Sequence, residues 1–170
     1  MLNESDGLVP MNYFLEPGHI FLPTRPTVIS VVVGSSVAVS VYDRKRLVGG
    51  MSHFQAPCVH DKYRATARYG NVATLTLVQM MIDDGSKVKH LEAQVFGGAH
   101  NRKVCTRNVG RANVIIARRI LASRRIPIIS EDVGGQKGRK VVFNARTNEI
   151  AVLKVDRLRK SDWYPYEIDR

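Results

Sequence analysis

Two valine-rich stretches on either side of a glycine–serine turn constrain the fold more than any other feature of this sequence. Residues 28–33 are β-branched at every position except Ser30, and a short apolar run of this kind is typical of a buried strand. Residues 37–42 alternate valine with alanine, serine and tyrosine, which is the period of a strand. The sequence therefore predicts two strands joined by the tight turn Gly34-Ser35-Ser36.

Further strand patterns occur at residues 47–54, 91–96, 126–130, 140–143 and 150–155. The three strands between residues 28 and 54 suggest an antiparallel meander, and the last two strands suggest a hairpin. Apolar residues recur with helical spacing over residues 70–84 and 108–125. The first predicted apolar face consists of Val72, Leu75, Val78 and Ile82, and the second of Ala112, Ile115, Ile116 and Ile120.

This pattern predicts an α+β protein, in which β-sheets are flanked by about two to three helices. With 170 residues, the chain is long enough for one domain with a sizeable core. We expect an N-terminal arm at residues 1–20, the domain itself at residues 21–155, and a polar C-terminal tail at residues 156–170. We find no internal repeat and no second domain.

The net charge of +11 favours an anionic partner, but its distribution does not point to nucleic acid. The basic residues are scattered along the chain, and no zinc-finger, RNP or helix-turn-helix motif accompanies them. A solvated basic surface is the first expectation, an acidic protein partner the second and nucleic acid the third. The longest uncharged run, 17 residues at 26–42, contains four serines, so we expect no membrane insertion and a cytoplasmic location.

Ser30, the turn at residues 34–36 and His53 are the candidates for chemistry. Ser36 lies where a turn enters a strand, and His53 lies on a later strand that could neighbour it. A hydroxyl within hydrogen-bond reach of an imidazole is the minimum for nucleophilic acyl transfer. Backbone amides that follow Gly34 could stabilise an oxyanion, which makes Gly34 and Ser35 candidates for that role. From the residues alone, the structural explanation is favoured, because Gly-Ser-Ser is a common turn and a single histidine on a strand is usually structural.

Six stretches of the chain, in this order, resemble the CheD family of chemoreceptor glutamine deamidases. They are residues 32–43, 48–54, 68–71, 92–99, 109–113 and 131–140, and the resemblance covers roughly residues 15–155. The resemblance implies hydrolysis of receptor glutamine amides to glutamate and ammonia. It also implies a fold like the catalytic domain of the cytotoxic necrotizing factors, with the cytoplasmic helices of methyl-accepting chemoreceptors as the substrate. A CheC-like phosphatase, which links CheD to phosphorylated CheY, is an implied second partner.

The family's catalytic residues fall on Ser36, His53 and Ser30. The family histidine matches His53, the family threonine matches Ser30, and the family cysteine matches Ser36. A serine therefore stands where the family has its thiol nucleophile. A serine hydroxyl is not ionised in advance as a thiol can be, so we expect activity to fall by about 10² or more. The alternative is a catalytically silent adaptor that binds receptor helices or a CheC-like partner.

The remaining candidates predict no other chemistry. Cys58 lies five residues after His53, which is the wrong parity for one strand face, and Cys105 has no local partner. The one tight pair of potential ligands, Cys58 with His60, is too few for a metal site, so we expect no metal and no cofactor. Two cysteines also exclude a disulfide framework.

Overall fold

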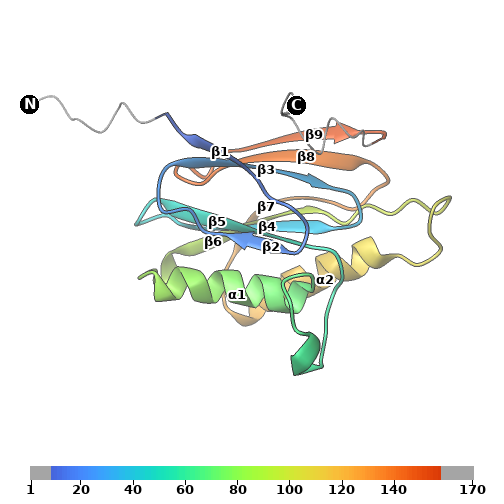
Figure 1. Cartoon of the computed structure of the whole chain (residues 1–170), viewed down its shortest axis with the longest axis horizontal. Helices are drawn as coiled ribbons and strands as arrows, with labels where there is room; N and C mark the ends of the chain where they lie inside the picture. Colours follow the sequence, from blue (N-terminus) through green and yellow to red (C-terminus); the bar gives the residue numbers. More distant parts are fainter. Residues whose placement is uncertain (1–8, 158–170) are drawn as a thin grey trace, which may run out of the picture.

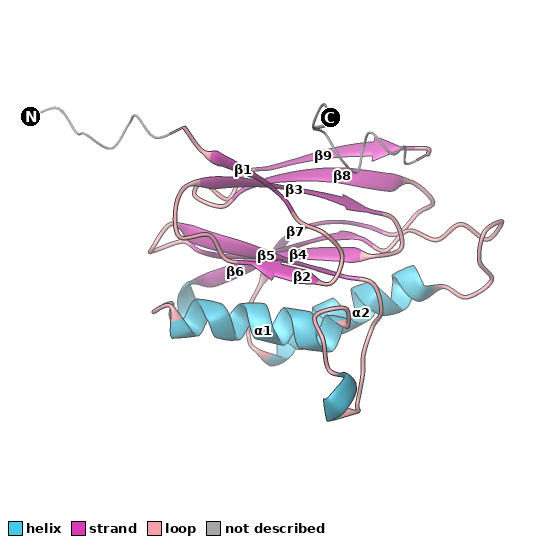
Figure 2. Ribbon diagram, in the orientation of Figure 1, coloured by secondary structure: helices cyan, strands magenta, loops and turns pink. Residues whose placement is uncertain are grey.

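The computed structural model describes residues 9–157 as two stacked β-sheets with a layer of helices against one of them (Figure 1). The outer sheet has the strand order β1-β3-β8-β9, and the inner sheet has the order β2-β5-β4-β6-β7. Helices α1 and α2 cover the free face of the inner sheet (Figure 2). The fold is therefore α+β, as the sequence predicts.

The strands are β1 (Met11–Phe14), β2 (His19–Phe21), β3 (Thr27–Val33), β4 (Val37–Asp43), β5 (Val48–Phe54), β6 (Leu91–Gly97), β7 (Ile128–Val133), β8 (Gly138–Asn144) and β9 (Ile150–Val155). The helices are α1 (Gly70–Asp83) and α2 (Val109–Ser123), with short 3₁₀ turns η1 (Lys62–Arg64) and η2 (Val88–His90). No helix within residues 9–157 is both long and apolar enough to cross a membrane.

The predicted meander over residues 28–54 is wrong at its first step, because β3 and β4 belong to different sheets. β3 pairs with β1 and β8, whereas β4 pairs with β5 and β6. The turn at residues 34–36 carries the chain from one layer to the other. Val31, Val33 and Ala38 then pack in the same apolar cluster between the sheets. Burial of the inner faces of both valine-rich strands favours this crossing over a flat hairpin.

The predicted apolar faces of the helices are displaced from the faces that are buried. The residues of α1 buried against the sheet are Gly70, Ala73, Thr74, Leu77, Val78 and Met81. Those of α2 are Gly110, Asn113, Val114, Ala117 and Leu121. Small residues lie at both helix starts and allow close approach to the sheet. A Cβ atom added at Gly70 would lie 2.5 Å from the ring of Phe54.

Part of the predicted N-terminal arm belongs to the sheets. β1 runs parallel to β3, and β2 runs antiparallel to β5 with His19 opposite His53. Residues 1–8 of the predicted arm and residues 158–170 of the predicted tail lie outside the described residues. The predicted hairpin at residues 140–155 is confirmed as the antiparallel pair β8 and β9.

Candidate active site

The turn between β3 and β4 is held in place through its carbonyl groups. The Gly34 carbonyl accepts a hydrogen bond from the Ala99 amide at 2.8 Å, and the Ser36 carbonyl accepts one from the Gly98 amide at 2.9 Å. The Ser35 carbonyl accepts from the Asn113 side-chain amide, also at 2.9 Å. All three carbonyls are thus fixed by neighbouring elements, and the position of the turn does not depend on its own side chains.

Glycine at the end of β6 makes this arrangement possible. Gly97 has a φ of +110°, and a Cβ atom at this position would lie 2.3 Å from the Ser36 carbonyl oxygen. A residue with a side chain would therefore push the turn away from β6, and its own backbone would be strained. The glycine pair at residues 97–98 is the reason that β6 can end directly beneath the turn.

His53 lies near the end of β5 with only 1% of its surface exposed. Its Nε2 atom is 2.8 Å from the Ser36 Oγ atom, and its Nδ1 atom is 3.4 Å from the Leu15 carbonyl oxygen. Because a carbonyl oxygen only accepts hydrogen bonds, Nδ1 carries the proton and donates a hydrogen bond to the Leu15 carbonyl. Nε2 is then free to accept the hydroxyl proton of Ser36, which is the arrangement that a general base needs.

Burial lowers the pKa of His53 from 6.5 to about 4, and the charge of His19 contributes in the same direction. The hydrogen bond to the Leu15 carbonyl opposes this change. The imidazole is therefore neutral at pH 7 and able to take a proton. Its low pKa also makes it a weak base, because proton transfer is most efficient when the pKa of the base lies near the working pH.

Asn113 on α2 joins the two halves of the site. Its side-chain amide donates to the Ser35 carbonyl at 2.9 Å and to the Gln55 carbonyl at 3.0 Å. Ser35 precedes the candidate nucleophile, and Gln55 lies two residues after His53. Asn113 is fully buried, and no hydrogen-bond partner for its Oδ1 atom is found within residues 9–157. One side chain therefore sets the spacing between the turn and β5, at the cost of an unsatisfied acceptor.

The structure does not connect Ser30 to His53 through its hydroxyl. Ile29 and Val31 pack between the sheets, so alternation places the Ser30 side chain on the other face of β3. The contact is through the backbone, because the Ser30 carbonyl accepts from the Leu15 amide at 2.9 Å. Leu15 in turn orients His53. The third group of the site is thus a main-chain carbonyl, which has no signature in the sequence.

The backbone amides of the turn remain candidates for stabilising a developing negative charge. Within residues 9–157, no hydrogen bond is found from the amides of Gly34, Ser35 or Ser36. Ser36 itself is partly buried and Ser35 is exposed, so a substrate can reach the turn. Fixed amides next to a nucleophile are the components of an oxyanion hole.

Neither cysteine is hydrogen-bonded to His53 in the described part of the chain, although Cys105 lines one hollow together with Gly34 and Ser35. Cys58 and Cys105 are both free and exposed. The Cys58 sulfur lies 3.9 Å from the His60 ring. In the described part of the chain, no group of three His, Cys, Asp or Glu residues could hold a metal ion.

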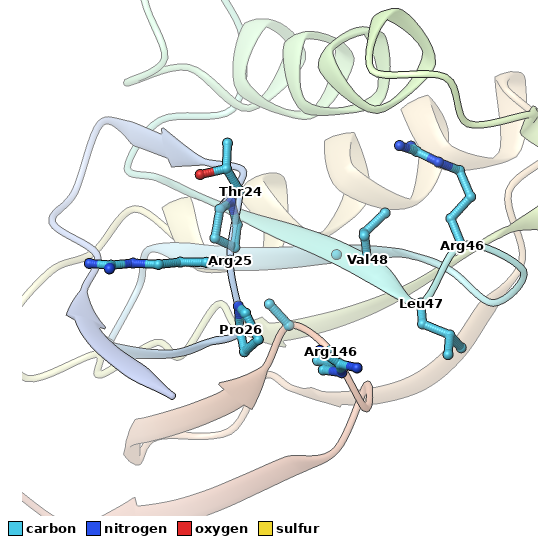
Figure 3. A pocket seen from close by; sticks show the side chains of 10 residues that line it. Thr24, Arg25, Pro26, Arg46, Leu47, Val48 and Arg146 are labelled. Atoms are coloured by element: carbon cyan, nitrogen blue, oxygen red, sulfur yellow. The ribbon is translucent and has the colours of Figure 1, made fainter. Parts of the chain in front are cut away.

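A separate hollow of about 270 Å³ lies at the opposite end of β5, beside Val48 and Gly49. Figure 3 shows Arg25, Arg46 and Arg146 at separate corners of this hollow, where they do not meet at one point. The Arg46 guanidinium is already paired with Asp84 at 2.9 Å. This hollow therefore has no convergent set of reactive groups, in contrast to the site at Ser36 and His53.

Comparison with known proteins points to one family. Residues 56–154 match the family model described as CheD chemotactic sensory transduction. A probable chemoreceptor glutamine deamidase CheD from Sulfurimonas denitrificans is 33% identical over 85% of this chain and 94% of its own length. That of Trichlorobacter lovleyi is 34% identical over 88% and 94%, and CheD 1 of Anaeromyxobacter dehalogenans is 41% identical over 77% of each chain. The range matched by the family model begins after β5 and does not include Ser36 or His53.

Proposed function

Because this chain belongs to the CheD family of chemoreceptor glutamine deamidases, we propose that it hydrolyses glutamine side-chain amides of chemoreceptors at Ser36 and His53. The observation that carries this proposal is the 2.8 Å contact between Ser36 Oγ and His53 Nε2. Burial keeps this imidazole neutral, and the Leu15 carbonyl orients it. The pair thus has the geometry of a nucleophile with its base.

The proposed reaction has two halves. Ser36 Oγ attacks the amide carbon of the glutamine side chain while His53 Nε2 takes the hydroxyl proton, and the turn amides stabilise the oxyanion. The C–N bond then breaks, and His53 returns the proton to the leaving nitrogen, so that ammonia departs and an ester remains on Ser36. Water, deprotonated by His53, attacks this ester. The products are glutamate and the restored Ser36 hydroxyl.

Two features make the proposed turnover slow. A hydroxyl must lose its proton during the attack, whereas a thiol beside an imidazole can be ionised beforehand. The base that takes this proton has a pKa of about 4, well below neutral pH. The same two features favour a second candidate function, in which the chain binds receptor helices, or a CheC-like phosphatase, without turnover.

Ammonia release from a glutamine-bearing chemoreceptor cytoplasmic fragment separates these two functions. If the chain is an enzyme, the wild type should release ammonia slowly, and Ser36→Cys should release it about 10² times faster or more, because the thiol is the stronger nucleophile. If the chain is an adaptor, the wild type should bind the same fragment and release no ammonia. Absence of both binding and release in the wild type and in Ser36→Cys would contradict both candidates.

A further inference from the structure

Two adjoining hollows extend from the turn at residues 34–36 along α2. The first, of about 540 Å³, begins at Gly34 and Ser35, and the second, of about 460 Å³, continues along α2. His100 and Gln136 line both hollows, so together they form one groove. We call this the α2 groove. It is larger than the hollow at the other end of β5, and its near end is the candidate nucleophile turn.

The far wall of the α2 groove is braced by a buried arginine. Arg139 is 2% exposed, and it donates to the Gly134 carbonyl at 2.8 Å and to Asp132 at 3.1 Å. The Gly135 carbonyl accepts from the His100 amide at 2.8 Å, which ties this wall to the loop after β6. These contacts hold the wall at residues 132–136 against the loop after β6.

The unpaired charge of the α2 groove is positive. Arg107 and Arg111 are exposed and, within residues 9–157, neither takes part in an ion pair. Arg118 also lines the groove, but it is paired with Glu131 at 2.7 Å. The carboxylate of Asp156, at the other end, is paired with Lys137 at 3.3 Å. An anionic partner would therefore meet two free guanidinium groups.

Exposed apolar side chains also line the α2 groove. Val104 is 82% exposed and Ile115 is 41% exposed, and both line the groove. Large exposed apolar side chains beside a basic rim are typical of a surface that binds another protein. An amphipathic helix with acidic residues on one flank would match both features.

We propose that the α2 groove binds an acidic amphipathic helix and holds it with one glutamine over Ser36. Arg107 and Arg111 select acidic residues on the helix face that carries the glutamine, since side chains four residues apart lie on one helix face. This inference rests on the proposed function for the identity of the glutamine. It adds the surface that recognises the helix and the charge pattern that the helix must carry.

Two synthetic helical peptides test the proposal by binding alone. Each carries one glutamine on its exposed face, flanked four residues away by glutamate in the first peptide and by lysine in the second. The variant Arg107→Glu/Arg111→Glu reverses the groove charge. The control Arg119→Glu/Lys87→Glu makes the same change in net charge at exposed residues that do not line the groove.

We expect the acidic peptide to bind the wild type and the control alike, and to bind the groove variant about tenfold more weakly or worse. The lysine peptide should bind more tightly to the groove variant than to the wild type. Equal losses in both variants would show that only net charge matters and would overturn the proposal, as would unchanged binding in the groove variant. Ammonia release is measured separately, so binding in this pattern without turnover would refute the proposed enzyme and leave the groove intact.

Discussion

Replacement of His53 with glutamine changes how stability depends on pH by an amount that follows from the burial of the imidazole. His53 is 1% exposed, and its pKa falls from 6.5 to about 4 on folding. Between these values the unfolded chain binds a proton at this residue that the folded chain does not. The free energy of unfolding therefore falls as the pH is lowered from about 6.5 to about 4.

The size of this change is about 3 kcal/mol, because each unit of pKa corresponds to about 1.4 kcal/mol. Below a pH of about 4 both states are protonated, and this residue causes no further loss. Asp132 and Glu131 also have pKa values lowered by hydrogen bonds to basic side chains, and they destabilise the fold in acid as well. Their contribution is common to both proteins and cancels when wild type and His53→Gln are compared.

Urea unfolding of wild type and His53→Gln at a series of pH values measures this difference. We expect the gap between the two free energies of unfolding to change by about 3 kcal/mol between pH 7 and pH 4, in the direction that disfavours the wild type at low pH. Direct titration of the His53 ring by NMR in the folded wild type provides the second readout. A parallel pair of pH profiles, together with a ring that titrates near 6.5, would refute the buried, neutral histidine.

Three further predictions follow from the contacts around the turn. Asn113→Ala should lower the free energy of unfolding by about 2–4 kcal/mol in urea denaturation, since it leaves two carbonyls without donors. Asn71→Ala, which removes the hydrogen bond to the Val59 carbonyl instead, is the matched control for activity. If Asn113→Ala leaves the Ser36→Cys rate unchanged, Asn113 does not position the site. Gly97→Ala should destabilise the fold and reduce the activity of the Ser36→Cys variant, because the new Cβ atom collides with the carbonyl oxygen of residue 36. A melting temperature equal to that of the protein with Gly97 would contradict this prediction. The kcat/KM of the wild type should fall on the acid side only near pH 4, and a fall centred near 6.5 would contradict the assignment of His53 as base.

The sequence predicts the strands of this fold better than their pairing. The valine-rich stretches at residues 28–33 and 37–42 identify β3 and β4, because the period of two is a local property of the chain. Whether the turn between them folds back within one sheet or crosses to another depends on which faces are buried. That outcome involves β6 and β8, which lie far away in the sequence.

The helix faces show a similar limit. α1 and α2 carry apolar residues over more than half of their circumference, so several faces fit the helical period. Glycine and alanine at Gly70, Ala73, Gly110 and Ala117 decide the contact face, since they let the helices approach the sheet closely. A prediction of the buried face from the spacing of large apolar residues does not take these small residues into account.

Part of the site could be anticipated and part could not. The family resemblance predicts that Ser36 and His53 lie together, and the hydrogen bond between them agrees with that prediction. Leu15 belongs to a segment that the sequence predicts to be an N-terminal arm. Any residue can supply a backbone carbonyl, so the side chain of Leu15 does not indicate this role. Asn113 lies in a stretch that resembles the family, yet nothing in its surroundings in the sequence indicates that its amide reaches both the turn at Ser35 and the carbonyl of Gln55 after β5.

Conversion of glutamine to glutamate in a chemoreceptor cytoplasmic fragment, followed by peptide mass spectrometry, tests the central claim most directly. The measurement compares wild type with Ser36→Ala, and binding of the fragment to both proteins is recorded in the same samples. If Ser36 is the nucleophile, the wild type converts at least one glutamine slowly, while Ser36→Ala binds the fragment and converts none. Conversion at the same rate by Ser36→Ala would contradict the role of Ser36 and place the chemistry elsewhere in the molecule.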